Sequence, residues 1–323
     1  MSDTAQFQKD KPQQNQYKGF QSGVIAAANS DAIFITLNAE RTDNALSQVS
    51  SVLASCPELE TEFRRQYPEA DLHITVAVGS HYWNLLSPEQ RPAELVHFPE
   101  MSAEQSAPET PADLLFHIRS ERHDLNYELA SRVSALLSGV VSLVEEVHGF
   151  RYLDSRDLTG FVDGTENPEG EHRIDVAVVG DDDAVFAGGS YIHLQRYEHD
   201  LDAWNRIQVK QQEDIIGRTK ADNIEYSSAD KAAFSHTKRV SLKDAEGQSV
   251  EILRHSMPYG DLSRKGLLFA SYGRSPEPFR SMLNSMIRGD EHGHADHLLG
   301  YSQAVTGQAF FAPSVDWLMA LKS

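Results

Sequence analysis

A short segment at residues 160–168, Gly-Phe-Val-Asp-Gly-Thr-Glu-Asn-Pro, places a carboxylate between two glycines and ends in Asn-Pro. This composition indicates a tight turn, because glycine adopts backbone angles that other residues avoid. Such a turn can hold Asp163 at the mouth of a cavity, while Gly164 lets a flat ligand approach the backbone. The alternative is an Asx-turn in which Asp163 only satisfies its own backbone. The segment lacks the Gly-Lys-Ser/Thr ending of a phosphate-binding loop, which excludes that chemistry.

Arg254 is the second residue whose setting points to chemistry. It lies in residues 250–257, Val-Glu-Ile-Leu-Arg-His-Ser-Met, where we expect a strand with side chains alternating between two faces. One face would carry Val250, Ile252, Arg254 and Ser256, and the other Glu251, Leu253, His255 and Met257. A guanidinium drawn inward beside apolar neighbours needs an acidic partner or a ligand. A solvated Arg254 on an edge strand is the alternative.

The chain has 14 histidines, most of which we expect on the surface or in satisfied core positions. His236 follows small and aromatic residues in Ala-Ala-Phe-Ser-His, a setting that suits coordination of iron by neutral imidazole. A second group lies nearer the C-terminus: His292, His294 and His297 with Asp290 and Asp296. Regular helical spacing is confined to His294 and His297, so a solvated loop is favoured over a zinc or iron site.

The elements that must position these residues follow a similar order in both halves of the chain. The first half predicts strands at 32–37, 72–78 (half-buried), 114–119 and 150–153, helices from a Thr42 or Asp43 cap and at 126–148, a helix end at Gly149 and a loop at 98–111. The second half predicts strands at 176–179, 191–197, 250–257 and 267–272, a helix at 201–209 and another with Ser275 as cap and Pro276 first. This order predicts an α+β fold of two ferredoxin-like domains with antiparallel sheets.

The composition is that of a globular protein with a strongly acidic balance. Its 323 residues include 29 basic and 48 acidic side chains, a formal charge of −19. This balance argues against nucleic-acid and anionic-membrane partners, which attract clustered Lys and Arg. Cys56 is the one cysteine and has apolar neighbours, so we expect an inert core thiol and a reducing, cytoplasmic location. An acidic surface would favour neutral or cationic small molecules over anionic ones.

The expected domain division is an arm and two halves of unequal length. Residues 1–18 are polar and rich in glutamine, which predicts a mobile arm rather than a signal peptide. Residues 19–150 would form the N-terminal domain and residues 151–323 the C-terminal domain. No stretch reaches the roughly 18 consecutive apolar residues of a membrane helix. The three tryptophans are better explained by packing than by electron transfer.

Five segments together resemble the dye-decolourising peroxidases, a haem-peroxidase family built from two ferredoxin-like halves. In chain order they read RDLTGFVDGTENP, EDIIGRTK, SHTKRV, SVEILRHSMPYG and AVTGQAFFAPS. The resemblance runs from about Tyr17 to the C-terminus and is strongest to the compact bacterial B-type members. It implies one haem b per chain, held in the C-terminal half. We find neither a twin-arginine leader nor a tail resembling the one that targets some relatives into encapsulin shells.

The resemblance also implies roles for single residues. Asp163 matches the distal aspartate, His236 the proximal ligand of the haem iron and Arg254 the distal arginine, with the separations typical of B-type members. Further positions match the distal face (Ser256), a propionate partner (Arg218), the cofactor-binding loop (Gly164, Thr165 and Glu166) and the acid behind the proximal histidine (Asp296). Asp290 and Glu291 are rivals of Asp296 for that last role.

The implied activity is that of a haem-dependent peroxidase. It would reduce hydrogen peroxide through a ferryl and porphyrin-radical intermediate, and oxidise small aromatic donors such as dyes and phenols in one-electron steps. Copies of the chain would associate as a dimer or larger homo-oligomer. One alternative is a haem-binding or iron-handling protein with incidental peroxidase activity. A haem-free binding module is another, and a visible absorption spectrum would distinguish it.

Overall fold

The computed structural model describes residues 19–322, so the expected arm at 1–18 lies outside the described residues. The strands are β1 Asp31–Ala39, β2 His73–Gly79, β3 Met101–Ser102, β4 Ser106–Ala107, β5 Leu114–Ser120, β6 Val141–Phe150, β7 Ser190–His199, β8 Leu253–Arg254, β9 Met257–Gly260, β10 Lys265–Gly273, β11 Ser302–Ala304 and β12 Gln308–Ala312. The α-helices are α1 Asp43–Gln66, α2 Trp83–Leu86, α3 His123–Leu136, α4 His172–Ala177, α5 Leu201–Arg206, α6 Val209–Ile216, α7 His236–Val240, α8 Glu277–Arg288 and α9 Val315–Ala320. Single 3₁₀ turns occur at Ser22–Val24, Pro68–Ala70, Asp181–Asp183 and His297–Gly300.

One antiparallel sheet connects the two halves of the chain. Its strand order is β11-β7-β12-β2-β5-β1-β6-β9-β10-β8, and β7 also pairs with β10. Starting from β7, the strand pairings run through β12, β2, β5, β1, β6, β9 and β10. Because β10 also pairs with β7, this part of the sheet closes on itself. The structure is thus of the expected α+β class with antiparallel pairing, but its strands are shared across the join between the halves.

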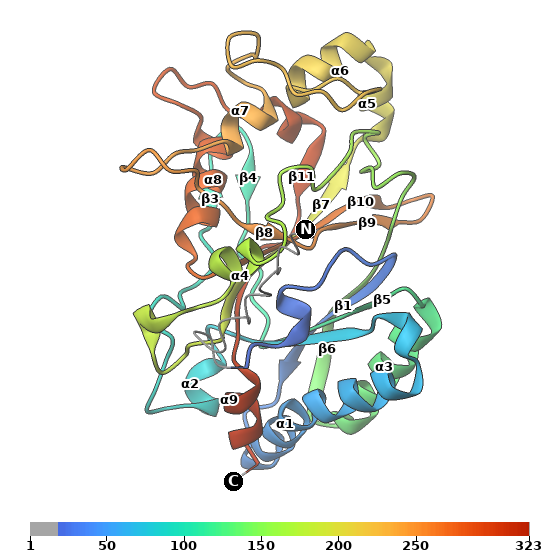
Figure 1. The fold of residues 1–323 in the computed structure, drawn as a ribbon, viewed down its shortest axis with the longest axis vertical. Coiled ribbons are helices and arrows are strands. Elements are labelled where there is room, and N and C mark those ends of the chain that lie inside the picture. The colour runs from blue at the N-terminus through green and yellow to red at the C-terminus, as the bar shows by residue number, and fades with distance from the viewer. Residues whose placement is uncertain (1–18, 323) are drawn as a thin grey trace, which may run out of the picture.

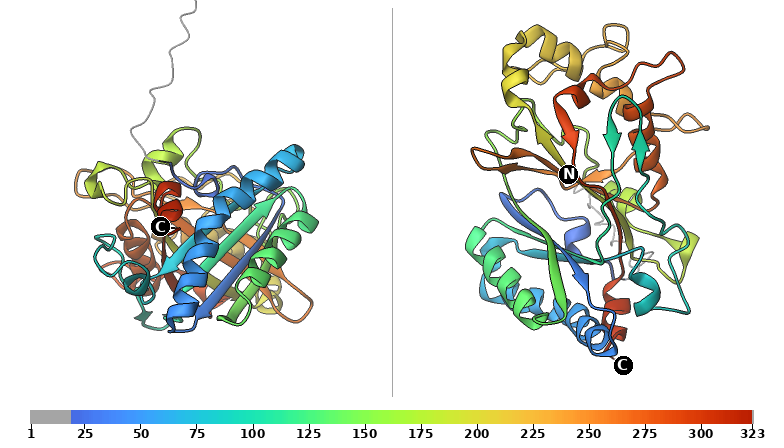
Figure 2. Two further views of the ribbon diagram at one scale, coloured as in Figure 1. Left: turned by 90° about the horizontal axis from the view of Figure 1, so that it is seen from below. Right: turned by 180° about the vertical axis from the view of Figure 1, so that it is seen from behind.

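The N-terminal half packs two long helices against its strands. Helices α1 and α3 lie side by side over the strands at one end of the molecule (Figures 1 and 2). Helix α1 begins where the sequence predicts, because the Thr42 hydroxyl accepts a hydrogen bond from the Ala45 amide at 3.2 Å. Cys56 of α1 is buried, and burial raises the pKa of its thiol to about 12. The prediction of an inert core thiol is confirmed.

Strand β2 corrects the expectation of a half-buried strand at 72–78. All seven of its residues are buried, because β2 pairs with β5 on one side and with β12 on the other. Ile74, Val76 and Val78 belong to the core under α1, whereas Ala77 belongs to a second core toward the C-terminal half. The alternation in the sequence therefore separates two cores rather than a core from solvent.

The C-terminal half carries α5, α6, α7 and α8 at the other end of the molecule (Figure 1). Helix α8 presents Phe279, Leu283 and Ile287 to a core that also contains Phe98 and Tyr197. The predicted start of this helix is nearly correct: Pro276 is the cap, and the Ser275 hydroxyl accepts from the Glu277 amide at 3.2 Å. In the described part of the chain, no helix is long and apolar enough to cross a membrane.

The predicted helix at 126–148 is wrong in its second part. Helix α3 ends at Leu136, the chain turns at Gly139 with φ of +83°, and β6 then runs from Val141 to Phe150. Gly149 therefore lies inside a strand and does not end a helix. The strand predicted at 150–153 is wrong, since β6 ends at Phe150 and residues 151–153 belong to no strand. Leu143 and Val144 are exposed on β6. Their apolar spacing fits one face of a helix, which is why the sequence pattern predicted a helix here.

Two predictions in the second half also need correction. Residues 176–179 do not form a strand: α4 includes Val176, and the chain leaves it in a bend. Residues 250–257 form no continuous strand, since β8 contains two residues and β9 begins at Met257. The helix predicted at 201–209 is divided into α5 and α6. The strands predicted at 191–197 and 267–272 are confirmed as parts of β7 and β10.

Candidate active site

Asp163 lies on the turn that follows β6, where the backbone is fixed by its own hydrogen bonds. Its amide donates to the Ser155 carbonyl at 3.0 Å, and its Oδ1 accepts from the Gly164 amide at 2.7 Å. Gly164 has φ of +75°, which explains why glycine is needed at this position. The Asx-type contact is therefore present, but it engages one carboxylate oxygen and leaves Oδ2 for another partner. Oδ1 therefore forms the contact expected of an Asx-turn, and Oδ2 is left for a ligand in the pocket.

The carboxyl group of Asp163 is an unusual acid. Burial raises its pKa above the ordinary value for aspartate, and the charge of Asp157 acts in the same direction. The positive charge of Arg254 opposes this rise. A carboxylate held in this balance can accept and return a proton more readily than an ordinary surface aspartate.

Arg254 faces the same space as Asp163. Both residues line a small pocket of about 120 Å³ between the two halves of the chain, together with Gly164 and Ser256. Within residues 19–322, the half-buried guanidinium of Arg254 forms no hydrogen bond or ion pair. This arrangement favours the interpretation in which the guanidinium of Arg254 binds a ligand over the one in which it is fully solvated. Ser256 is bound on one side, since its hydroxyl accepts from the Ala270 amide at 3.2 Å.

Asn167 is a residue that the sequence interpretation missed. Its side chain pairs with the backbone of Arg254 in both directions: Nδ2 donates to the Arg254 carbonyl at 2.8 Å, and Oδ1 accepts from the Arg254 amide at 2.9 Å. It therefore joins the Asp163 turn to β8, where a neighbouring strand would otherwise supply these bonds. The Asn-Pro pair signalled only a turn, and the local sequence gives no sign of this second role.

For the peroxidase activity that the sequence resemblance implies, replacing Asn167 with alanine is expected to slow the reaction with hydrogen peroxide by about tenfold to a hundredfold, because Arg254 is then no longer held in the pocket that it shares with Asp163. The rate is measured by stopped-flow mixing at the haem absorption band. Asn126→Ala, which removes hydrogen bonds of a buried asparagine to Asp31 in the N-terminal half, is the control. Equal rates in both variants would show that Asn167 does not position Arg254.

His236 is the first residue of α7 and is held from behind by an acid. Its Nδ1 lies 2.7 Å from Oδ2 of Asp296, a buried residue whose other oxygen accepts from the Leu298 amide at 2.9 Å. Burial alone would lower the pKa of His236, but the charge of Asp296 and the hydrogen bond to it outweigh burial and raise that pKa. With Nδ1 engaged, Nε2 is the nitrogen available to a metal.

The structure also distinguishes Asp296 from its two rivals. Asp290 lies 3.3 Å from Arg239 and accepts hydrogen bonds from the amide of His294 in its own loop. Glu291 is almost fully exposed. The three nearby histidines do not converge with His236 as a metal cluster: His294 contacts Asp290, and the ring of His297 stacks on Phe234.

These residues fit a haem group. Asp163 and Arg254 line one pocket, and the charges of both act on His236. A Cβ added at Gly164 would meet nothing nearer than Asn167 Nδ2 at 3.8 Å, so the backbone leaves room at this turn. An imidazole supported by a carboxylate is a strong donor to iron, and a guanidinium and an acid on the opposite side suit a bound peroxide.

Arg218 and its neighbours form a network beside this turn. The guanidinium lies 3.2 Å from Glu166 and 3.2 Å from Glu225, and donates to Asn223 Oδ1 at 3.0 Å. Thr165 joins the same network by accepting from Asn223 Nδ2 at 3.1 Å. Arg218 therefore has protein carboxylates as partners here, and its pairing with a propionate stays a prediction.

The pocket that contains Asp163 has a local charge opposite to that of the whole chain. Five arginines line it: Arg119, Arg151, Arg156, Arg173 and Arg254. Arg156 and Arg173 donate to backbone carbonyls rather than to carboxylates, so their charges are not neutralised by their hydrogen-bond partners. The net charge of −19 therefore does not describe the electrostatic environment of this pocket.

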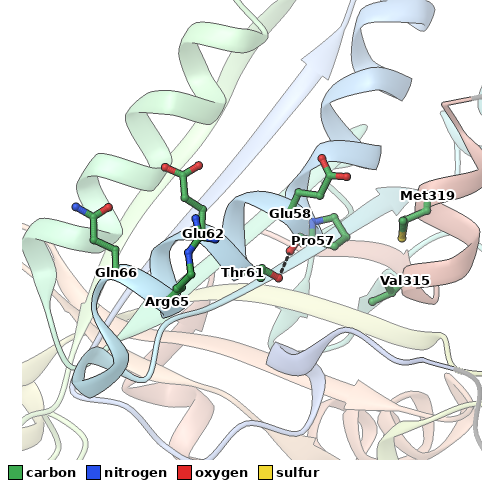
Figure 3. A pocket seen from close by; sticks show the side chains of 8 residues that line it. All are labelled: Pro57, Glu58, Thr61, Glu62, Arg65, Gln66, Val315 and Met319. Carbon is green, nitrogen blue, oxygen red and sulfur yellow. Dashed lines mark hydrogen bonds between the residues drawn. The ribbon is translucent and has the colours of Figure 1, made fainter.

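A larger hollow of about 740 Å³ lies at the far end of the molecule, between α1 and α9. Figure 3 shows its lining, which Glu58, Glu62 and Arg65 of α1 and Val315 and Met319 of α9 share. The site residues predicted from the sequence lie elsewhere, around the smaller pocket and α7. The larger of these two hollows is therefore not the candidate active site.

The fold and these residues define a class: an α+β protein with a carboxylate-supported histidine and a pocket that contains an acid and an arginine, as in a haem peroxidase. Residues 21–151 match the family model described as Dyp-type peroxidase, N-terminal, and residues 154–317 match the one described as Dyp-type peroxidase, C-terminal. The chain belongs to the Dyp-type peroxidase family. It is accordingly a haem-dependent peroxidase, whose substrates are hydrogen peroxide and an organic donor.

Individual relatives are similar over nearly the whole chain. The dye-decolorizing peroxidase of Mycolicibacterium paratuberculosis is 42% identical over 298 residues, which cover 91% of this chain and 84% of the relative. The crystal structure of a Dyp-type peroxidase protein from Shewanella oneidensis is 49% identical with a TM-score of 0.91, covering 94% of this chain and 98% of that one. A variant of DypB from Rhodococcus jostii, solved in complex with haem, is 38% identical with a TM-score of 0.90, covering 93% and 98%.

Proposed function

We propose that His236 binds the haem iron, and that Asp163 and Arg254 together cleave hydrogen peroxide on the opposite side. The observation that carries this proposal is the pocket that Asp163 and Arg254 share, whose two charges both act on His236. Asp296 would keep the proton on His236 Nδ1, fix the orientation of the ring and strengthen its donation to iron. The haem of the Rhodococcus jostii variant supports the choice of cofactor.

When bound, haem supplies an iron that binds peroxide and the electrons that break its O–O bond. The chain's own residues would manage the proton and the charge. Asp163 Oδ2 accepts the proton from the oxygen nearer the iron and delivers it to the outer oxygen, which leaves as water. The guanidinium of Arg254 stabilises the negative charge that develops on the oxygens, and it favours the ionised form of Asp163.

Peroxide-dependent oxidation of a phenol or a dye by the haem-loaded protein tests this function. We expect turnover that exceeds an equal concentration of free haem and requires peroxide. A haem carrier or iron-handling protein would show negligible turnover under the same conditions. A flat visible spectrum after reconstitution with haem would instead contradict the haem site itself.

Three finer expectations are also proposals. We propose ferredoxin-like domains at 19–150 and 151–323, supported by two consecutive family models, although β9 and β12 pair with strands of the first half. Self-association as a homo-oligomer is supported by the exposed Leu143 and Val144 on β6. The buried single cysteine is compatible with a cytoplasmic location.

A further inference from the structure

Two histidines and a glutamate converge on the surface where the N-terminal half meets the long connection between α2 and β5. His81, His97 and Glu109 each offer a ligand atom, and these atoms lie within 4.8 Å of one another. His81 Nε2 is 3.9 Å from Glu109 Oε1, and His97 Nδ1 is 3.6 Å from the same oxygen. The two imidazole rings lie with their centroids 4.3 Å apart. All three residues are remote in sequence from those of the haem site.

The separations within this cluster are longer than a hydrogen bond. His148 and Glu146 are hydrogen-bonded at 2.6 Å and His172 and Glu251 at 2.8 Å, whereas His292 and Glu291 are 3.6 Å apart, as in the cluster. In the described chain, no hydrogen bond joins His81, His97 and Glu109 to one another. Ligands of tetrahedral Zn²⁺ at 2.0–2.1 Å from the metal lie about 3.3 Å apart. The 3.6 Å between His97 and Glu109 is close to that value, and the 3.9 Å between His81 and Glu109 exceeds it by about 0.6 Å, so small side-chain rotations are needed to bring the ligand atoms to one ion.

Each of the three segments is held in place by contacts outside the cluster. Arg91 connects both histidine segments, since its Nη1 donates to the Ser80 carbonyl at 2.9 Å and its Nη2 to the Leu95 carbonyl at 2.8 Å. The glutamate segment is held at the next residue, where the Thr110 amide donates to the Gly307 carbonyl at 2.8 Å. The backbone that carries the three ligands is therefore held before any ion binds, and only the side chains must still be ordered, which limits the entropy cost of binding.

We propose that His81, His97 and Glu109 form a surface site for one divalent transition-metal ion of the zinc type, with water as the fourth ligand. Two imidazoles and one carboxylate are the ligands that zinc prefers, whereas Mg²⁺ and Ca²⁺ require a shell of oxygens. This site is separate from the haem iron, and its existence does not depend on the peroxidase function.

The ion would join the segment after β2, which carries His81, to the connection at 87–113, which carries His97 and Glu109. That connection also contacts the C-terminal half, where the Glu94 amide donates to the Tyr191 hydroxyl at 3.1 Å and Ser275 donates to Glu94 at 2.6 Å. A metal bound at one side of the connection therefore restrains a segment that bridges both halves. Because the ion binds the folded chain and not the unfolded one, it raises the melting temperature.

The test is titration of Zn²⁺ into the tag-free, haem-loaded protein after treatment with a chelator, followed by calorimetry. We expect one ion per chain, no heat with Mg²⁺, and an anomalous density peak between the three side chains in a zinc-soaked crystal. His97→Ala and Glu109→Gln should each weaken binding by about tenfold or more. His172→Ala is the matched control. His172 is similarly exposed and is paired with carboxylates, and among its described contacts there is no second imidazole.

A melting curve provides a second readout. The parent protein and His172→Ala should melt at a higher temperature with Zn²⁺ than without it, while His97→Ala should show no such shift. Absence of one-to-one binding, a peak elsewhere on the surface, or equal affinity in His97→Ala and His172→Ala would overturn the proposal. Loss of peroxidase activity in any variant has no bearing on it, so the two proposals fail separately.

Discussion

Replacement of His236 with alanine is expected to abolish stable haem binding. His236 Nε2 is the proposed iron ligand, because Nδ1 is held by the buried Asp296 and the charges of Asp163 and Arg254 act on the ring. The measurement is the Soret band and the haem content of the variant after reconstitution. We expect a weak, shifted band that is lost on gel filtration.

The control for this variant is His294→Ala in the neighbouring loop. His294 is exposed and contacts Asp290, so its loss should leave the haem content unchanged. Asp296→Asn is a second variant with a different expected outcome: haem is retained, but its spectrum shifts because the imidazole becomes a weaker donor. A full Soret band in His236→Ala would overturn the ligand assignment, whatever its activity.

The sequence predicted those parts of the fold in which local signals agree with tertiary contacts. The start of α1 was found because Thr42 is both the expected cap and the observed one. The helix at 126–148 was mispredicted because apolar residues on the exposed face of β6 have the spacing of a helix, and the signal for the turn at Gly139 was outweighed. Closure of the sheet through β7 and β10 depends on pairings between distant segments, which periodicity does not report.

The site shows the same division between local and non-local information. Asp163, His236 and Arg254 were selected by motifs; Asp163 and Arg254 line one pocket, and their charges act on His236. Choosing Asp296 over Asp290 required the 2.7 Å contact with His236, since all candidate acids lie in one short loop. Asn167 acts through two hydrogen bonds to a residue 87 positions away, and no local pattern indicates such a contact.

Arg254→Leu is expected to slow the reaction with hydrogen peroxide more than Asp163→Ala does. The guanidinium stabilises the charge that forms as the O–O bond breaks, and its loss should cost about a thousandfold in rate. Loss of the carboxylate removes a proton acceptor that water can partly replace, at a cost of about a hundredfold. Stopped-flow mixing of each haem-loaded variant with peroxide gives both rates. The reverse order would assign the leading role to Asp163.

The pH dependence of these rates tests the link between the two residues. Asp163 must be ionised to accept a proton, so the rate falls as pH falls through its pKa, which burial raises above that of an ordinary aspartate. The positive charge of Arg254 lowers that pKa, so Arg254→Leu should move the acid limb of the profile to higher pH, and Asp163→Ala should remove the limb. Arg151→Leu is the matched control: it removes another guanidinium from the same pocket, one that contacts Glu121 and does not contribute to the Asp163 shift. An acid limb that stays in place in Arg254→Leu would mean that Arg254 does not control the ionisation of Asp163.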